Sequence, residues 1–183
     1  MLPFPTLETE RLILRRMQSG DCDGLFDLYS SDEVTRYIEI PTLAQPDQAE
    51  SIIAELDSLF QDGLGLRWGV FEREEGLLIG TCGYHSWDRK RFRAEMSYDL
   101  GPRHWGQGYM REALLAVLNY GFETMLLHRV EALVDPGDTR SQNLLYGLGF
   151  KVEGILREHD YLKGRFLDDM VFALLRQDWA RLG

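Results

Sequence analysis

The stretch Arg103-His104-Trp105-Gly106-Gln107-Gly108 lies where a predicted strand ends and a predicted long helix begins. Gly106 and Gly108 lack a Cβ atom, so the backbone can turn its N–H groups toward a common point. The start of a helix adds unpaired N–H groups and the positive end of the helix dipole. This geometry favours a diphosphate, and Arg103 adds a charged donor that suits the same group.

Two other kinds of glycine-rich loop do not fit this stretch. The spacing differs from the Gly-x-Gly-x-x-Gly of dinucleotide-binding folds, and the Gly-Lys-Ser/Thr of an ATP-binding P-loop is missing. Taken alone, the loop is equally compatible with a tight turn that binds nothing. The flanking sequence has to distinguish the two interpretations.

Hydrophobic periodicity on either side of the loop predicts the elements of the fold. Parallel pairing is expected for the strands at 93–100 and 129–134, because the helix between them forms a right-handed crossover. Short turns between the earlier strands predict antiparallel neighbours. The fold class is therefore α/β (α+β), with a mixed, mostly antiparallel central sheet, helices on both faces and a single domain over 1–183. Strands are expected at 11–17, 66–73, 77–85, 93–100, 129–134, 152–157 and 166–175, and helices at 21–29, 33–37, 46–61, 106–126 and 139–148.

Two details of the C-terminal third are specific enough to be checked. Thr139 and Gln142 have the spacing of a capping box at the start of the helix at 139–148. The strand at 166–175 is apolar on both faces, which predicts that it is buried in the sheet.

Composition limits the kinds of partner. The 183 residues carry a formal net charge of −10. This charge argues against direct binding of nucleic acid, which needs clustered Lys and Arg. It allows a cationic acceptor, although the charge has a simpler explanation in solubility. The two cysteines and four histidines have no metal-ligand spacing, so no metal is expected. We expect no signal peptide and no membrane-spanning segment, and hence a cytoplasmic location.

The loop and its flanks resemble the GNAT (GCN5-related) N-acetyltransferase superfamily. Arg103-x-x-Gly106-x-Gly108 is similar to the coenzyme A pyrophosphate loop of that superfamily. In combination, the motifs resemble the RimJ/RimL-like branch of ribosomal-protein N-terminal acetyltransferases. The similarity extends from about Leu7 to Trp179. Its motifs are Thr9-Glu10-Arg11-Leu12, Ala94-Glu95-Met96-Ser97-Tyr98-Asp99-Leu100, Trp105-Gly106-Gln107-Gly108-Tyr109-Met110-Arg111-Glu112-Ala113, Asp138-Thr139-Arg140-Ser141, Leu148-Gly149-Phe150 and Glu153-Gly154.

The resemblance implies how a donor molecule would lie in the fold. Two parallel strands, here Ala94 to Leu100 and Arg129 to Val134, separate, and acetyl-coenzyme A lies in the gap as the acyl donor. A homodimer is also compatible with the resemblance. The residues implied in donor binding are Ser97, Tyr98, Leu100, Arg103, Trp105, Gly106, Gln107, Gly108, Tyr109, Met110, Asp138 and Ser141.

The resemblance further implies that the amine attacks the thioester directly, and neither cysteine lies in a nucleophile motif. Glu95 is the candidate base, acting through water, and a solvated strand residue is its alternative. Asp138 stands where the family commonly has Asn, so it could accept from pantetheine, repel a thiolate or act as a base. Ser141 is a weaker candidate for the leaving thiol, because a serine at a helix start is often only a cap. Leu145 replaces the Tyr that many relatives use as an acid, and Tyr146 is one position away.

The leading hypothesis is an acyl-CoA-dependent N-acyltransferase that acetylates a primary amine, with a protein N-terminal α-amino group as the acceptor. Acetylation of a small amine, such as an amino acid, polyamine or aminoglycoside, is a second hypothesis. A non-catalytic acyl-CoA sensor is a third, because Asp138 and the missing Tyr depart from the family pattern. Acceptor specificity is expected in the loop-rich segments 38–45 and 156–166.

Overall fold

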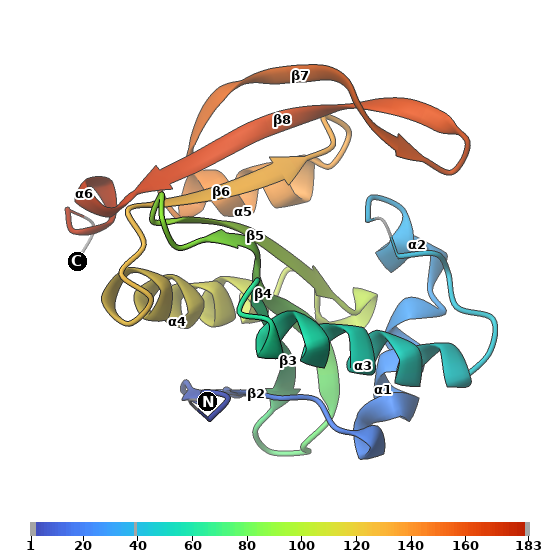
Figure 1. Cartoon of the computed structure of the whole chain (residues 1–183). Helices are drawn as coiled ribbons and strands as arrows, with labels where there is room; N and C mark the ends of the chain where they lie inside the picture. The colour runs from blue at the N-terminus through green and yellow to red at the C-terminus, as the bar shows by residue number, and fades with distance from the viewer. Residues whose placement is uncertain (1–2, 39, 182–183) are drawn as a thin grey trace.

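A computed structural model describes residues 3–38 and 40–181 of the chain. The ends of the expected domain and Glu39 of the expected specificity segment lie outside the described residues. Within the described part, the strands form one sheet in the order β1-β2-β3-β4-β5-β6-β8-β7 (Figure 1). The strands are β1 (Leu7–Glu8), β2 (Leu12–Arg15), β3 (Leu66–Glu72), β4 (Leu78–Asp88), β5 (Arg93–Leu100), β6 (Arg129–Val134), β7 (Lys151–Leu162) and β8 (Arg165–Leu175).

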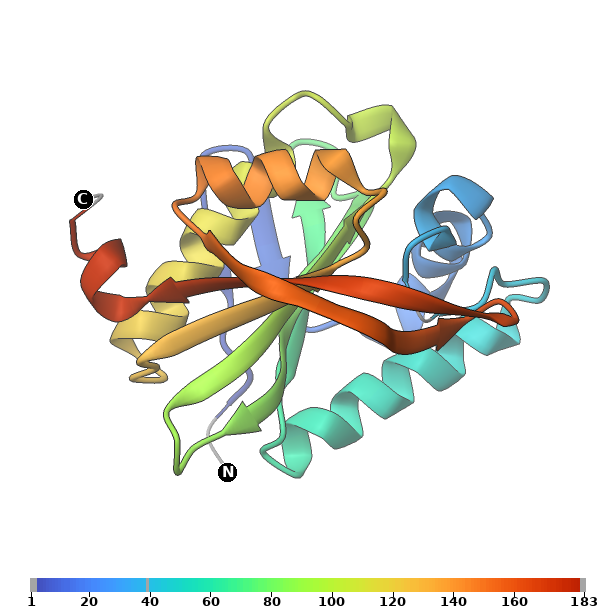
Figure 2. The same ribbon diagram turned by 90° about the horizontal axis from the view of Figure 1, so that it is seen from above.

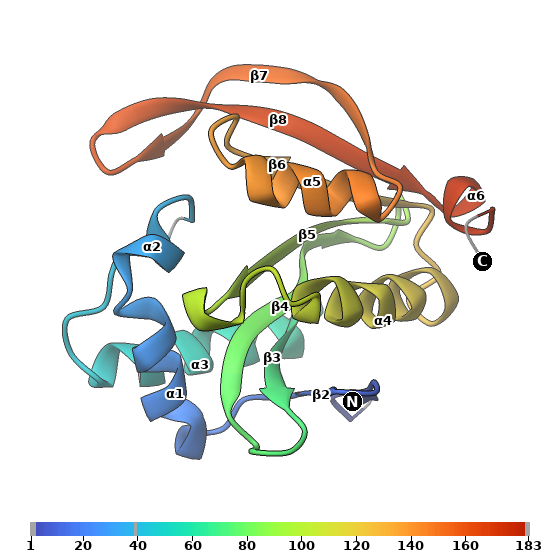
Figure 3. The same cartoon turned by 180° about the vertical axis from the view of Figure 1, so that it is seen from behind.

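The helices are distributed over both faces of this sheet, as Figures 2 and 3 show from above and from behind. Helices α4 and α5 lie on one face, and helices α1, α2 and α3 lie on the other. The α-helices are α1 (Cys22–Tyr29), α2 (Asp32–Thr35), α3 (Asp47–Gln61), α4 (Tyr109–Glu123), α5 (Thr139–Gly147) and α6 (Arg176–Trp179), with 3-10 turns at Ser19–Asp21 and Pro102–His104.

Each face of the sheet has its own hydrophobic core. On the α4 and α5 side, Trp68 and Phe172 are fully buried with the apolar side of α4. On the α1 to α3 side, Leu25 and Ile53 pack with Phe71. The two cores follow from period-2 alternation along the strands and from 3.6-residue spacing along the helices. The predicted sheet with helices on both faces is therefore confirmed.

The central feature of the sheet is the parallel pair β5 and β6, which separates early. Only three residue pairs join the two strands, and the last pair is Glu95 with Glu131. Helix α4 connects them as the expected crossover, and the other neighbouring strands are antiparallel. Beyond Glu95 the two strands diverge, which confirms the expected splayed pair and leaves backbone edges facing each other across a gap.

Helix α4 lies close to the sheet because Gly121 has no side chain. A Cβ atom at Gly121 would lie 2.8 Å from Cζ of Tyr84, which is too close for ordinary packing. The hydroxyl of Tyr84 donates a hydrogen bond of 3.0 Å to the carbonyl oxygen of Val117, one turn earlier. Tyr84 therefore fixes the distance between α4 and β4, and with it the position of the loop that precedes α4.

Several expected boundaries were wrong for physical reasons. Helix α4 begins at Tyr109 instead of Gly106, because Gly106 and Gly108 have φ angles of +72° and +81° that an α-helix does not allow. The strand expected at 11–17 is confined to β2, and the short β1 pairs with it. The strand expected at 152–157 continues to Leu162 as β7. The first part of β8 is mostly exposed, so burial of the whole strand was also a wrong expectation.

The helix cap expected at Thr139 was placed one residue late. Asp138 is the N-cap of α5, and its side chain accepts a hydrogen bond from the backbone N–H of Ser141. The side chain of Gln142 donates to the carbonyl oxygen of Pro136, so it does not form a capping box with Thr139. A carboxylate at Asp138 satisfies a helix N–H group directly, which explains why the chain enters the helix there.

Candidate active site

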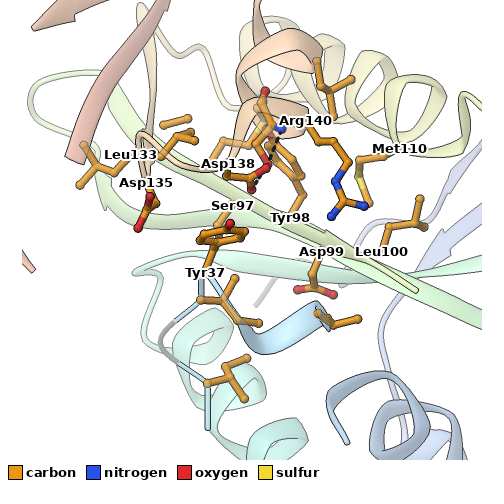
Figure 4. Close-up of a pocket in the computed structure, with 18 of the residues that line it drawn as sticks. Tyr37, Ser97, Tyr98, Asp99, Leu100, Met110, Leu133, Asp135, Asp138 and Arg140 are labelled. Atoms are coloured by element: carbon orange, nitrogen blue, oxygen red, sulfur yellow. Dashed lines mark hydrogen bonds between the residues drawn. The ribbon is translucent and has the colours of Figure 1, made fainter. Parts of the chain in front are cut away.

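A cavity of about 800 Å³ lies where β5 and β6 separate. Its walls come from β5, β6, the start of α4, the start of α5, the segment after α2 and the β7–β8 hairpin. Figure 4 shows side chains from several of these elements gathered around one space. Most residues predicted from the sequence line this cavity, namely Glu95, Ser97, Tyr98, Leu100, Trp105, Gly106, Gly108, Tyr109, Met110, Asp138 and Ser141.

The glycine loop contributes backbone donors to this cavity. The positive φ angles of Gly106 and Gly108 are accessible to glycine at little cost. Within the described residues, the N–H groups of Gly108, Tyr109 and Met110 donate to no acceptor of the chain itself. These three groups stand at the positive end of α4, so the site suits an anion such as a diphosphate.

Two predicted loop residues do not line the cavity. Arg103 is exposed, and its carbonyl oxygen accepts a hydrogen bond of 2.8 Å from the side chain of Gln107. Gln107 in turn offers its own carbonyl oxygen to Arg11, at 3.0 Å. In this structure both residues therefore shape the loop from outside the cavity. Their contact with a donor molecule remains a prediction.

Trp105 and Arg140 close the same end of the cavity. The indole N–H of Trp105 donates to the carbonyl oxygen of Leu100 at 2.7 Å, which fixes the ring. The guanidinium carbon of Arg140 lies 3.6 Å from the centre of the Trp105 ring. A cation stacked on a fixed aromatic ring is held in place while its N–H groups remain available. Arg140 was not predicted as a site residue, because a single arginine at a helix start has no distinctive spacing.

Glu112 of α4 and Arg11 connect the N-terminal segment to the glycine loop through hydrogen bonds. Glu112 Oε1 accepts from the Thr9 hydroxyl at 2.6 Å and from the Arg11 backbone N–H at 2.8 Å. Its Oε2 accepts from Arg11 Nε at 2.7 Å. Burial raises the pKa of Glu112, but the hydrogen bonds from Thr9 and Arg11 outweigh it, and the pKa lies below its ordinary value. Arg11 thus joins Glu112 of α4 to the carbonyl oxygen of Gln107 in the loop.

Glu95 lies at the point where the two parallel strands part. Its side chain is 24% exposed, and Oε1 lies 3.8 Å from Nε2 of His85 on the neighbouring strand. Burial, and then the charge of Arg67, lowers the pKa of His85, which favours a neutral imidazole. The structure therefore brings Glu95 to the cavity wall together with a second titratable group.

A buried polar network forms the floor beside Glu95. Arg67 donates from Nε to the Thr81 hydroxyl at 2.7 Å and from Nη1 to the Ser97 hydroxyl at 2.6 Å, and Nη2 donates to the Asp99 carboxylate. The Tyr29 hydroxyl donates to the same carboxylate at 2.9 Å, which ties α1 to β5. Burial lowers the pKa of Arg67, but Tyr29 and Asp99 raise it above its ordinary value, so the guanidinium stays charged. This network fixes the side chain of Ser97 on the cavity wall.

Asp138 and Ser141 form one unit at the start of α5. The Ser141 hydroxyl donates to Asp138 Oδ2 at 2.7 Å, and the Ser141 backbone N–H donates to Oδ1 at 3.1 Å. The Tyr98 hydroxyl donates to the Ser141 carbonyl oxygen at 3.3 Å, and burial raises the pKa of Tyr98. Leu145 is fully buried, and the exposed Tyr146 packs on Phe172 instead of lining the cavity. Tyr146 is therefore not placed to act as the missing acid.

The sequence did not single out a histidine–aspartate pair on the β7–β8 hairpin. His159 Nδ1 lies 2.9 Å from Asp169 Oδ2, and both residues line the cavity. Ten residues and a reversal of the chain separate them, so no local motif marks the pair. Asp135, Tyr37 and Arg67 also line the cavity and were likewise missed.

Three further observations concern metal binding, membrane insertion and the reactivity of a cysteine. Within residues 3–38 and 40–181, no group of three His, Cys, Asp or Glu side chains could hold a metal ion. No described helix is both long and apolar enough to cross a membrane. Cys82 is fully buried in the core, and burial raises the pKa of its thiol to about 12, so this thiol is not an activated nucleophile.

Comparison with known proteins agrees with this geometry. A family model described as an acetyltransferase (GNAT) domain matches residues 11–151. The uncharacterized N-acetyltransferase p20 of Bacillus licheniformis is 41% identical over 175 residues, which cover 96% of this chain and 98% of that protein. The ribosomal protein uS5-alanine N-acetyltransferase of Escherichia coli (strain K12) is 27% identical and covers 98% of this chain and 95% of its own length.

A solved structure of RimL, a ribosomal L7/L12 α-N-protein acetyltransferase, superposes with a TM-score of 0.85. It is 17% identical and covers 94% of each chain, so this comparison concerns the fold alone. The family match, the splayed strands and the amide-lined loop all agree. This chain therefore belongs to the GNAT acetyltransferase family, in the RimJ/RimL-like branch with the ribosomal-protein acetyltransferases, and is an acyltransferase.

Proposed function

We propose that the protein transfers an acetyl group from acetyl-coenzyme A to the α-amino group of a protein N-terminus. The supporting observation is that two features meet in one cavity. The N–H groups of Gly108, Tyr109 and Met110, which have no acceptor among the described residues, lie at one end, and the diverging edges of β5 and β6 form its walls. An extended molecule with a diphosphate at one end and a chain of amides behind it matches both features.

The donor supplies a thioester, and the chain supplies binding groups and proton transfer. The loop amides would hold the diphosphate, with Arg140 beside it on Trp105. The edge of β5 beyond Glu95, where pairing with β6 has ended, would hold the amide chain. The acceptor nitrogen would then attack the acyl carbon directly, which agrees with the buried, protonated state of Cys82.

Three predicted catalytic residues belong to this proposal. Glu95, at the parting of the strands, is a candidate to take a proton from the amine through a water molecule. Ser141 is a candidate donor to the departing sulfur, and its hydroxyl proton is directed toward Asp138 in the structure described here. Asp138 would orient that hydroxyl, and its negative charge would oppose a thiolate close by.

The acceptor would enter between α2 and the β7–β8 hairpin. Glu33, Tyr37 and Ile38 line this part of the cavity from one side, and Asp160 and Leu162 line it from the other. An α-amino group has a pKa of roughly 7.7–8.0, so it needs less help to become neutral than a lysine amine at about 10.4. The relative from Escherichia coli is described as an alanine N-acetyltransferase of a ribosomal protein, which supports an α-amine acceptor.

The decisive experiment follows release of free thiol from acetyl-coenzyme A with a panel of acceptors. The panel contains peptides with free N-termini, the same peptides with blocked N-termini, and small amines that include amino acids, polyamines and aminoglycosides. We expect release only with free N-termini. Release with small amines alone would favour the second hypothesis, and tight donor binding without turnover would favour a sensor. A cytoplasmic location and a homodimer remain predictions that belong to the same proposal.

A further inference from the structure

The His159–Asp169 pair projects into the acceptor half of the cavity from two neighbouring strands. The side chain of Asp169 on β8 is 12% exposed, whereas that of His159 on β7 is 48% exposed. One partner is therefore fixed in the wall, and the other faces the space through which an acceptor would approach. A half-exposed imidazole held by a buried carboxylate is an arrangement typical of proton transfer.

The backbone of β7 is distorted at this point. Leu156 pairs with Asp169, but the next pair is Asp160 with Leu167, so the strand carries additional residues between the two pairs. Glu158, within this bulge, has a φ of +50°, and its N–H donates to Asp168 Oδ1 at 2.8 Å. A positive φ is unfavourable for a residue other than glycine. Bulges of this kind change the direction of side chains near active sites. The bulge brings His159 into contact with Asp169.

The contact selects one tautomer of the imidazole. A carboxylate accepts hydrogen bonds and does not donate, so His159 Nδ1 carries the proton that Asp169 Oδ2 receives. Nε2 then has a free lone pair, and among the described residues it makes no hydrogen bond. We propose that Nε2 of His159 takes the proton that the acceptor amine loses, with Asp169 as the positioning residue. This assignment rests on the proposed acyl transfer.

The proton balance is simple. The amine nitrogen forms a bond to the acyl carbon, the carbon–sulfur bond breaks, and its electron pair goes to sulfur. The additional proton on the new amide nitrogen passes to His159 Nε2. It is then released to solvent, from which the coenzyme A thiolate regains a proton. No oxidant, metal or further co-reactant is needed.

In this proposal His159 takes the proton that the sequence alone assigned to Glu95, because the contact with Asp169 fixes the tautomer that leaves His159 Nε2 as an acceptor. Glu95 also lies beside His85, at 3.8 Å. The lining of the cavity that contains His159 carries both signs of charge. Its carboxylates are Asp169 on β8, Asp160 on β7, Asp135 after β6, Asp138 before α5, Glu33 on α2, and Glu95 and Asp99 on β5, and its arginines are Arg67 on β3, Arg111 on α4 and Arg140 on α5. Two further histidines, His85 on β4 and His104 before α4, also line the cavity.

The first test compares pH profiles of kcat/KM with a peptide acceptor. Each rate is divided by the fraction of peptide amine that is neutral at that pH. Any fall in rate that remains at low pH, called the acidic limb here, then reports the protonation of a group of the enzyme. We expect His159→Asn to lose this limb and to lower kcat by roughly 10²- to 10⁴-fold, the range for general-base catalysis. Asp169→Asn should also weaken the limb, because an amide can donate to Nδ1 and stabilise the wrong tautomer. Glu95→Gln should retain the limb.

The second test uses chemical rescue, which a merely structural role would not show. Added imidazole should restore turnover to His159→Ala in a saturable manner, because the side chain is half-exposed and its removal leaves an open space. The control is His128→Ala. His128 is exposed and does not line the cavity, so this variant should keep wild-type rates and show no response to imidazole.

A third measurement does not depend on turnover. Nitrogen NMR of the imidazoles in the resting protein should show His159 with a proton on Nδ1, and this tautomer should change in Asp169→Asn. The inference is overturned if His159→Asn keeps the acidic limb, if Glu95→Gln loses it, or if NMR shows the proton on Nε2. These outcomes differ from failure of the proposed function, in which the wild-type protein releases no thiol with any amine.

Discussion

The Ser141 hydroxyl donates a hydrogen bond of 2.7 Å to Asp138 Oδ2, while the backbone N–H of Ser141 donates to Asp138 Oδ1. Asp138 therefore caps helix α5 and orients a hydroxyl in the cavity at the same time. Asp138→Ala should lower the free energy of unfolding by about 1 kcal/mol, the usual cost of losing a helix cap. Asp138→Asn keeps an acceptor oxygen and should cost less, as urea unfolding would measure. Equal losses for the two variants would contradict the capping role.

The glycine loop gives a prediction about donor binding. A Cβ atom at Gly106 would have no heavy atom within 4 Å, so a side chain has space there, and the φ of +72° is the only strain it would meet. Gly106→Glu and Gly108→Glu should abolish binding of acetyl-coenzyme A in calorimetric titration, because a carboxylate would meet the diphosphate at the free amides. Gly76→Glu is the matched control. Gly76 also has a positive φ and open surroundings, but it lies in the turn between β3 and β4. Unchanged affinity in Gly106→Glu would place the diphosphate elsewhere.

Glu112 makes stability depend on pH. Its pKa is lowered in the folded state, so its contribution is complete above the ordinary pKa of 4.5 and is lost as the pH falls through the folded value. Glu112→Gln should cost about 1–2 kcal/mol at pH 7, because it weakens hydrogen bonds from Thr9 and Arg11. The difference from wild type should shrink as the pH falls below about 4. Unfolding in urea at several pH values measures it.

Glu153→Gln provides the comparison for Glu112. Its carboxylate pairs with Arg129 but is 47% exposed, so solvent screens the pair and removal should cost at most about 1 kcal/mol. A difference in free energy of unfolding between Glu112→Gln and wild type that stays constant over the whole pH range would show that the carboxylate charge does not strengthen the hydrogen bonds from Thr9 and Arg11.

The close packing of α4 on Tyr84 also has a measurable consequence. Gly121→Ala should destabilise the protein by about 1–3 kcal/mol, because the new methyl group overlaps the Tyr84 ring. Gly147→Ala is the control, since a Cβ atom at the end of α5 meets nothing within 4 Å. The control should be neutral or slightly stabilising in thermal denaturation. Equal melting temperatures for both variants would show that α4 can move away from β4.

Local patterns in the sequence were sufficient for much of the fold. Apolar segments bounded by turns identified β3 to β5, and helical spacing identified α3. The strands bury residues against the cores on both faces of the sheet, whereas α3 buries one side. The glycines before α4 identified the anion site through backbone conformation alone. The start of α4 was misplaced, since loop glycines and helix residues are not distinguished by hydrophobic period.

The acceptor half of the cavity could not be predicted in the same way. The contact between His159 and Asp169 depends on a bulge opposite Asp168, and a bulge changes the register without a marked change in composition. Arg140 acquires its position from Trp105, 35 places earlier in the chain, through a stacking contact. Side chains that meet through tertiary packing leave no spacing that a single sequence can reveal.

The early separation of β5 from β6 has a mechanical consequence. Only three residue pairs, all between β5 and β6, join strands β1 to β5 to strands β6, β7 and β8. This junction should therefore open at a lower free energy than the other strand pairs of the sheet. A donor bound between the separated edges of β5 and β6 would form hydrogen bonds to both strands and hold them together while it is bound. Amide exchange in 129–134 should then slow on binding more than exchange in β3, and the substrate would stiffen the enzyme that consumes it.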